Sequence, residues 1–160
     1  DATTAGVSPH TRPDALAIGS DAPGPGRAAT LGVPLVLVGS SLGSFCAVRA
    51  AADGGADRLV LRAPPTSLAA VAKTRFSWLP VDLFLRHDFD NLAAAPRVRC
   101  PALVVHGDRD GVVPPSFGRE LAAALPAARF VLVEGHGHNT LDLSPFGPVA
   151  DEVRAALTGR

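Results

Sequence analysis

One serine has the position of a catalytic nucleophile. Residues 35–45, LVLVGSSLGSF, place an apolar run directly before a serine that has a glycine two residues away on each side. This pattern is typical of a sharp turn between a strand and a helix, in which small neighbours are needed because backbone segments come close together and the nucleophile's own backbone is strained. The pattern predicts that Ser41 is the nucleophile, and that Ser40 and Ser44 are ordinary turn and helix residues.

Two later loops could supply the partners of this serine. A serine hydroxyl is a weak nucleophile unless a histidine accepts its proton and a carboxylate holds the tautomer of that histidine. With this type of turn, the partners follow in the order acid, then histidine, on loops after buried strands. The segment LVVHGDRDGVVP provides Asp110 and the segment LVEGHGHNTL provides His138. We therefore predict a catalytic triad of Ser41, Asp110 and His138.

Other polar residues of the same two loops have simpler roles. Asp108 is predicted to form a turn and His136 to lie in a glycine-rich loop, and each stays an alternative member of the triad. His106, at the end of an apolar run, is predicted to pack structurally. The histidines at 136 and 138 lack the i, i+4 spacing of a helical metal site and no cysteine lies near them, so we expect no metal. Acyl transfer by such a triad also needs no cofactor.

Strands and helices must position these residues. Four short apolar runs rich in valine and leucine lie at residues 34–39, 57–63, 101–107 and 128–135. Their apolarity is continuous rather than alternating, as in strands that are buried on both faces of a parallel sheet. Helix-like segments follow at residues 41–55, 115–126 and 144–159. This order predicts an α/β fold with a mostly parallel sheet flanked by helices.

Two segments depart from this rhythm within a single predicted domain of residues 1–160. The connection 64–99 is longer than usual and is predicted to hold extra helices, as a short cap over one end of the sheet. Trp78 and Phe84 in this connection are predicted to line the substrate pocket, with ordinary peripheral helices as the alternative. Residues 1–31 are dense in proline and glycine and are predicted to be irregular.

The composition limits the possible partners and location. The chain has 160 residues, 47% of them hydrophobic, and its formal net charge is zero with the positive residues scattered, which argues against binding to nucleic acid. The apolar runs are too short for a transmembrane helix of about 20 residues. Cys46 and Cys100 lie beside apolar residues, which favours buried free thiols and a cytoplasmic location. A small-molecule or acyl substrate fits these limits.

Three motifs of the chain resemble the α/β-hydrolase superfamily. GSSLGS is similar to its nucleophile turn, HGDRDGVVP to its HGxxDxxVP pattern, whose aspartate falls on Asp110, and GHGHN to its GxGHN pattern, whose histidine falls on His138. Longer segments are similar to the branch of serine hydrolases that includes abhydrolase-type depalmitoylases and esterases. The resemblance covers about residues 32–158. It implies cleavage of an ester, thioester or amide bond through an acyl-enzyme intermediate.

The same resemblance implies that the chain is the C-terminal part of this fold, truncated at its N-terminus. An oxyanion hole uses backbone N–H groups, of which the first would be that of Leu42, and the second is expected to be missing with the upstream half. The strand at 34–39 would then be an exposed apolar edge at which the chain self-associates. The alternative function is a catalytically impaired fragment or a non-catalytic module with the same fold.

Overall fold

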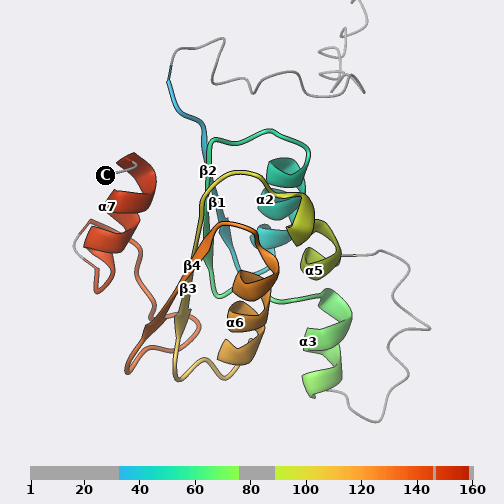
Figure 1. Cartoon of the computed structure of the whole chain (residues 1–160). Helices are drawn as coiled ribbons and strands as arrows, with labels where there is room; N and C mark the ends of the chain where they lie inside the picture. The colour runs from blue at the N-terminus through green and yellow to red at the C-terminus, as the bar shows by residue number, and fades with distance from the viewer. Residues whose placement is uncertain (1–32, 76–88, 146, 159–160) are drawn as a thin grey trace, which may run out of the picture.

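The computed structural model describes residues 33–75, 89–145 and 147–158, and it contains one parallel sheet with the strand order β1-β2-β3-β4 (Figure 1). The strands are β1 (Val36–Ser40), β2 (Arg58–Arg62), β3 (Ala102–Gly107) and β4 (Ala128–Val133). The helices are α2 (Gly43–Ala52), α3 (Leu68–Arg75), α5 (Asn91–Ala94), the 3-10 helix η1 (Ala95–Arg97), α6 (Pro115–Ala124) and α7 (Ala150–Thr158). The predicted α/β fold with a parallel sheet is confirmed.

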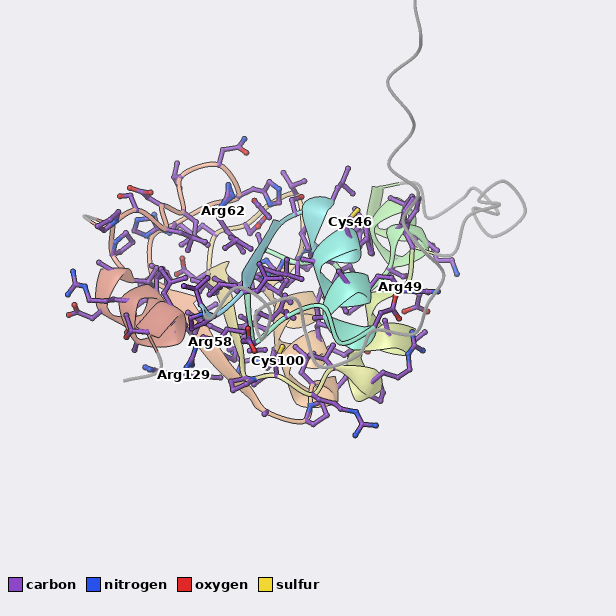
Figure 2. The ribbon with its side chains drawn as sticks, turned by 90° about the horizontal axis from the view of Figure 1, so that it is seen from above. Cys46, Arg49, Arg58, Arg62, Cys100 and Arg129 are labelled. Atoms are coloured by element: carbon purple, nitrogen blue, oxygen red, sulfur yellow. The ribbon has the colours of Figure 1, made fainter. Side chains whose placement is uncertain are left out.

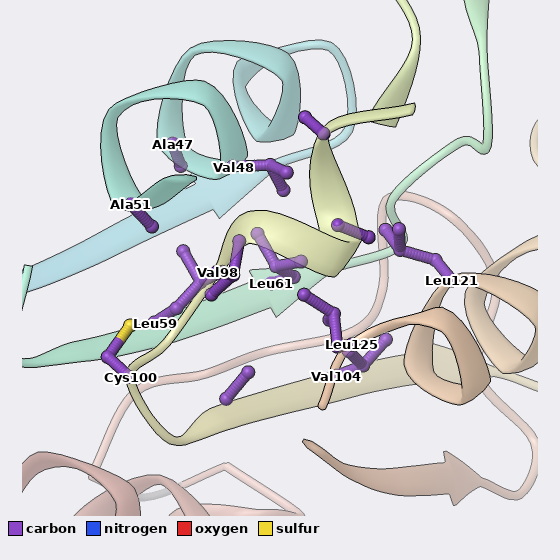
Figure 3. Close-up of a cluster of buried hydrophobic side chains, with 13 residues drawn as sticks. Ala47, Val48, Ala51, Leu59, Leu61, Val98, Cys100, Val104, Leu121 and Leu125 are labelled. Carbon is purple, nitrogen blue, oxygen red and sulfur yellow. The ribbon is translucent and has the colours of Figure 1, made fainter. Parts of the chain in front are cut away.

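Helices cover both faces of the sheet. In Figure 1, α2, α5 and α6 lie on one side of the strands and α7 lies on the other. Neighbouring residues of a strand point to opposite faces, so Leu59 and Leu61 of β2 join the larger core cluster, drawn in Figure 3, with side chains of α2 and α6. Val60, between them, packs in a second cluster on the side of α7. Burial on both faces explains the continuous apolarity of β2 and β3, whereas β1 and β4, at the two edges of the described sheet, are only partly buried.

The register of the sheet brings the ends of its strands together. Ser40 pairs with Arg62 at the end of β1 and β2, and Gly107 pairs with Val133 at the end of β3 and β4. Because all four strands are parallel, their carboxyl ends lie at the same end of the sheet, and the loops that follow the strands leave from that end. The loops after β1, β3 and β4 are the ones that carry the predicted triad.

β1 is an edge strand in the described part of the chain. It pairs with β2, and its other side has no strand neighbour among the described residues. Val38 of β1 is 58% exposed, whereas Leu59, Val60 and Leu61 of β2 are buried. The exposed edge that was expected at residues 34–39 is therefore present in the described fold.

The connection 64–99 is partly described. Helices α3, α5 and η1 all lie in this connection, as the prediction of extra helices there expected. Helix α5 begins after Asp90, whose carboxylate accepts a hydrogen bond from the Ala93 amide, 3.0 Å away, as an N-cap. Trp78 and Phe84 of this connection lie outside the described residues, as do residues 1–31, which were predicted to be irregular.

A buried asparagine fastens this connection to α2. The Nδ2 group of Asn91 donates hydrogen bonds to Ser44 Oγ at 2.9 Å and to the Pro65 carbonyl oxygen at 2.8 Å. Asn91 and Ser44 are both almost completely buried. Ser44 was predicted to be an ordinary helix residue, but it is part of a satisfied polar contact inside the fold.

Both cysteines are free, and they lie well apart in Figure 2. Cys100 is buried, and this burial raises the pKa of its thiol because an apolar surrounding disfavours the thiolate. Cys46 is exposed, so the prediction that it is buried was wrong: it lies on the outer side of α2, between residues that face the core. None of the helices in the described part of the chain has the length and apolarity to cross a membrane.

Candidate active site

Ser41 lies in a strained turn between β1 and α2. Its φ angle is 49°, in the left-handed region that a residue with a side chain seldom adopts. Its amide donates a hydrogen bond to the Arg62 carbonyl oxygen, 2.8 Å away on the neighbouring strand. This bond holds the backbone of Ser41 in the strained conformation that the sequence pattern predicted.

The two glycines around Ser41 have different environments. A Cβ atom added to Gly39 would lie 2.8 Å from Ala47 Cβ and 2.8 Å from Ser44 Cα, so only glycine fits between β1 and α2. A Cβ atom added to Gly43 would meet nothing within 4 Å. The expectation that crowding requires both glycines is therefore wrong for Gly43, because the first residue of α2 faces open space in the described fold.

Ser41, His138 and Asp110 form a continuous hydrogen-bonded series. The Oγ atom of Ser41 lies 3.0 Å from Nε2 of His138, and Nδ1 of His138 lies 2.7 Å from Oδ2 of Asp110. An ionised carboxylate only accepts, so Nδ1 of His138 carries the proton and Nε2 is free to accept one from the serine hydroxyl. Residues 97 positions apart in the chain thus meet within hydrogen-bond distance.

Asp110 is held as an ionised carboxylate. Its side chain is fully buried, and its Oδ1 accepts hydrogen bonds from the amides of Val112 and Val113, both at 2.9 Å. Burial by itself would raise the pKa of this carboxyl, but the bonds from Val113, His138 and Val112 together lower the pKa below its usual value. The charge needed beside His138 is therefore present at neutral pH.

The alternative residues of the two loops are not brought to Ser41. The Asp108 side chain is exposed, and its amide bonds the Val133 carbonyl oxygen at 3.0 Å. Nδ1 of His136 lies 2.7 Å from the carbonyl oxygen of Glu134, within its own loop. In the described part of the chain, no three histidine, cysteine or acidic side chains gather as metal ligands.

Arg62 contacts this group although the sequence did not single it out. Its Nη1 atom donates a hydrogen bond to the carbonyl oxygen of His138 at 3.1 Å, and Figure 2 labels its position. A second close approach fixes the same loop, since a Cβ atom added to Gly107 would overlap the carbonyl oxygen of His136. The end of β3 and Arg62 at the end of β2 therefore fix the position of the loop that carries His138 relative to the sheet.

Leu42 follows Ser41 at the start of α2. It is the N-cap residue of α2, where backbone N–H groups have no partner within the helix. Its side chain is 60% exposed, so the turn is open to solvent on that side in the described structure. Its amide follows Ser41 directly, which is the place of one oxyanion donor in a nucleophile turn.

Comparisons with known proteins bear on the family of the chain. The family model for TAP-like proteins matches residues 86–158. The alpha/beta hydrolase domain-containing protein aho-3 of Caenorhabditis elegans is 34% identical over 118 residues, which are 70% of this chain and 34% of that protein. The chain belongs to the α/β-hydrolase superfamily. The uncharacterized protein Rv2307c of Mycobacterium tuberculosis is 37% identical over 121 residues, which are 75% of this chain and 43% of that protein.

Solved structures share the α/β-hydrolase fold. A puromycin-hydrolyzing peptidase of Mycobacterium tuberculosis matches 81% of this chain and 22% of that chain with a TM-score of 0.60 and 22% identity. At such identity the likeness concerns the fold. This α/β-hydrolase chain spans 43% of the length of Rv2307c, so it corresponds to less than half of that relative.

Proposed function

We propose that the chain is a serine hydrolase that cleaves a carboxylic ester, thioester or amide bond through an acyl-enzyme intermediate. The observation that carries the proposal is the double contact of His138, with Ser41 Oγ at 3.0 Å on one ring nitrogen and Asp110 Oδ2 at 2.7 Å on the other. Membership of the α/β-hydrolase superfamily supports it. The branch with depalmitoylases and esterases stays a prediction.

Each residue has one role in the proposed reaction. Oγ of Ser41 attacks the carbonyl carbon of the substrate while Nε2 of His138 takes the hydroxyl proton. Asp110 holds His138 in the Nδ1–H tautomer and stabilises the imidazolium ion. His138 then gives its proton to the leaving group, and the acyl group stays on Ser41. In the second half of the reaction, His138 removes a proton from a water molecule, which attacks the acyl carbon. His138 then returns the proton to Oγ of Ser41, and the acid is released.

The negative charge that develops on the carbonyl oxygen needs backbone donors. We assign the first of these donors to the Leu42 amide, which directly follows the nucleophile. One such donor stabilises the transition state by about 3 to 4 kcal/mol. The segment 64–99 is proposed as the cap over this end of the sheet. Trp78 and Phe84 of this segment are proposed to line the acyl pocket, and both lie outside the described residues.

A fluorophosphonate probe tests the proposal, because it forms a covalent bond with an activated serine. We expect labelling of the protein to disappear in Ser41→Ala and to persist in Ser40→Ala, the matched control at the neighbouring position. Labelling that persists in Ser41→Ala would contradict the assignment of the nucleophile. If the unmodified protein is not labelled, the alternative of a catalytically impaired or non-catalytic module replaces it.

A further inference from the structure

A second histidine reaches the carboxylate that contacts His138. His106, on β3, is fully buried. Its Nε2 atom lies 3.0 Å from the carbonyl oxygen of Val113 and 3.3 Å from Oδ2 of Asp110. Oδ2 is the oxygen that also accepts the hydrogen bond from Nδ1 of His138. Two imidazole rings thus approach one carboxylate oxygen.

The surroundings of His106 determine its tautomer. A carbonyl oxygen and an ionised carboxylate can only accept, so Nε2 must carry the proton. Nδ1 is buried and has no hydrogen-bond partner within the described residues. A Cβ atom added to Gly118 of α6 would overlap Nδ1, so the helix backbone lies against this atom. A proton on Nδ1 would be a buried donor without an acceptor, which is unfavourable.

We propose that His106 is a positioning residue that holds Asp110 in the orientation from which Oδ2 accepts the hydrogen bond of His138. The inference rests on the proposed function, in which Asp110 orients the catalytic imidazole. The amides of Val112 and Val113 hold Oδ1, and the N–H group of His106 draws Oδ2 and opposes rotation of the carboxylate. In a buried site of low polarity, this attraction is stronger than it would be in water.

A neutral ring suits this role, because it supplies a donor without offsetting the charge of Asp110. Burial is the main cause that lowers the pKa of His106, and it outweighs the opposite effects of the Val113 carbonyl group and Asp110. A charged His138 disfavours a second positive charge at His106 as well. Asp110 and His138 are the titratable groups that act on this ring. These effects favour the neutral form of His106, in which Nε2 keeps its N–H group.

The ring nitrogens of His106 can be observed directly in the full-length protein. Two-dimensional ¹H–¹⁵N NMR of the histidine rings, recorded between about pH 5.5 and 8.5 around the ordinary pKa of histidine, reports the tautomer and the titration of each ring. We expect His106 to show the Nε2–H tautomer without titration over this range. An Nδ1–H tautomer, or a normal titration of His106, overturns the proposal. This measurement needs no activity, so it separates failure of this inference from failure of the proposed function.

Two substitutions test whether His106 acts through Asp110. His106→Gln keeps an N–H donor near the place of Nε2, and His106→Leu removes it. We expect His106→Leu to slow fluorophosphonate labelling about tenfold, the effect of losing one donor to a charged group, and to weaken the low-field NMR signal of the His138 Nδ1 proton. We expect His106→Gln to recover part of both.

A control in the same strand separates positioning from packing. Val104→Ala removes buried side-chain volume on the side of β3 that also faces α6, so it should lower the melting temperature and leave the low-field signal in place. The proposal is overturned if His106→Leu has the same fluorophosphonate labelling rate and the same low-field signal as Val104→Ala. If His106→Leu does not fold, the ring-nitrogen measurement and the His106→Gln variant decide it.

Discussion

Replacement of Gly118 by alanine should destabilise the fold through the ring of His106. Gly118 is a buried residue of α6, and an added Cβ atom would overlap Nδ1 of His106 and lie 3.2 Å and 3.3 Å from its Cγ and Cε1 atoms. The ring is fully buried, so it cannot turn away into solvent. Overpacking of a core costs about 1 to 3 kcal/mol, and alanine recovers up to about 1 kcal/mol of helix propensity. With an overlap at a confined ring, we expect a net loss of about 1 to 2 kcal/mol in the free energy of unfolding.

Gly43→Ala is the matched control for this substitution. Both glycines lie in α-helices, but a Cβ atom at Gly43 has no neighbour within 4 Å. The control should therefore keep the stability of the unmodified chain or raise it by up to about 0.5 kcal/mol. Urea denaturation followed by circular dichroism gives both free energies, and an unchanged slope shows that the denatured state is the same.

A double variant identifies the ring of His106 as the origin of the loss. His106→Ala removes the ring, so the methyl group of Gly118→Ala then has space. The double variant should be about 1 to 2 kcal/mol more stable than the sum of the single effects predicts. Equal stability of Gly118→Ala and Gly43→Ala, or strict additivity in the double variant, would refute the packing of α6 against Nδ1 of His106.

Three further outcomes are expected. Arg62→Met removes the hydrogen bond to the His138 carbonyl oxygen and should slow fluorophosphonate labelling about tenfold, with a smaller effect for Arg62→Lys; an unchanged rate in both would show that this bond does not position the loop. Val38→Lys adds a charge to the exposed edge strand and should reduce self-association in sedimentation velocity, whereas equal association of both proteins would exclude this edge as the contact. The lowered pKa of Asp110 stabilises the fold above its unfolded pKa of about 3.9, and this contribution is lost as the pH falls through the folded pKa. Below about pH 4, the free energy of unfolding from urea titrations should therefore fall less steeply for Asp110→Asn than for the unmodified chain. Equal slopes of the two curves would contradict the assignment.

The predicted parts of the site are those that rest on local patterns. The strained turn at Ser41 could be predicted because it needs a preceding strand, a following helix and small neighbours, all within a few residues. Asp110 and His138 follow apolar strands, and the carboxyl ends of parallel strands lie at the same end of the sheet. The structure brings these three residues within hydrogen-bond distance of one another.

The parts that were not predicted depend on contacts between distant residues. Arg62 bonds a carbonyl oxygen 76 residues later, and Asn91 bonds a serine 47 residues earlier. No spacing in a single sequence indicates such a partner. His106 was expected to pack only structurally, and its relation to Asp110 depends on how the loop after β3 folds back over four residues. The open surroundings of Gly43 depend in the same way on which elements lie nearby in space.

The position of the serine in the sheet has a consequence for the order in which the site would lose its structure. Ser41 follows β1 and His138 follows β4, and each of these strands has a single strand neighbour among the described residues, whereas Asp110 follows β3, which is paired on both sides. Local opening begins where few contacts oppose it, so amide hydrogen exchange should be faster along β1 and β4 than along β3. On mild heating, Ser41 and His138 would lose their contact while Asp110, beside the central strand, keeps its place. The proposed hydrolytic activity would then fade at temperatures at which most of the sheet is still folded.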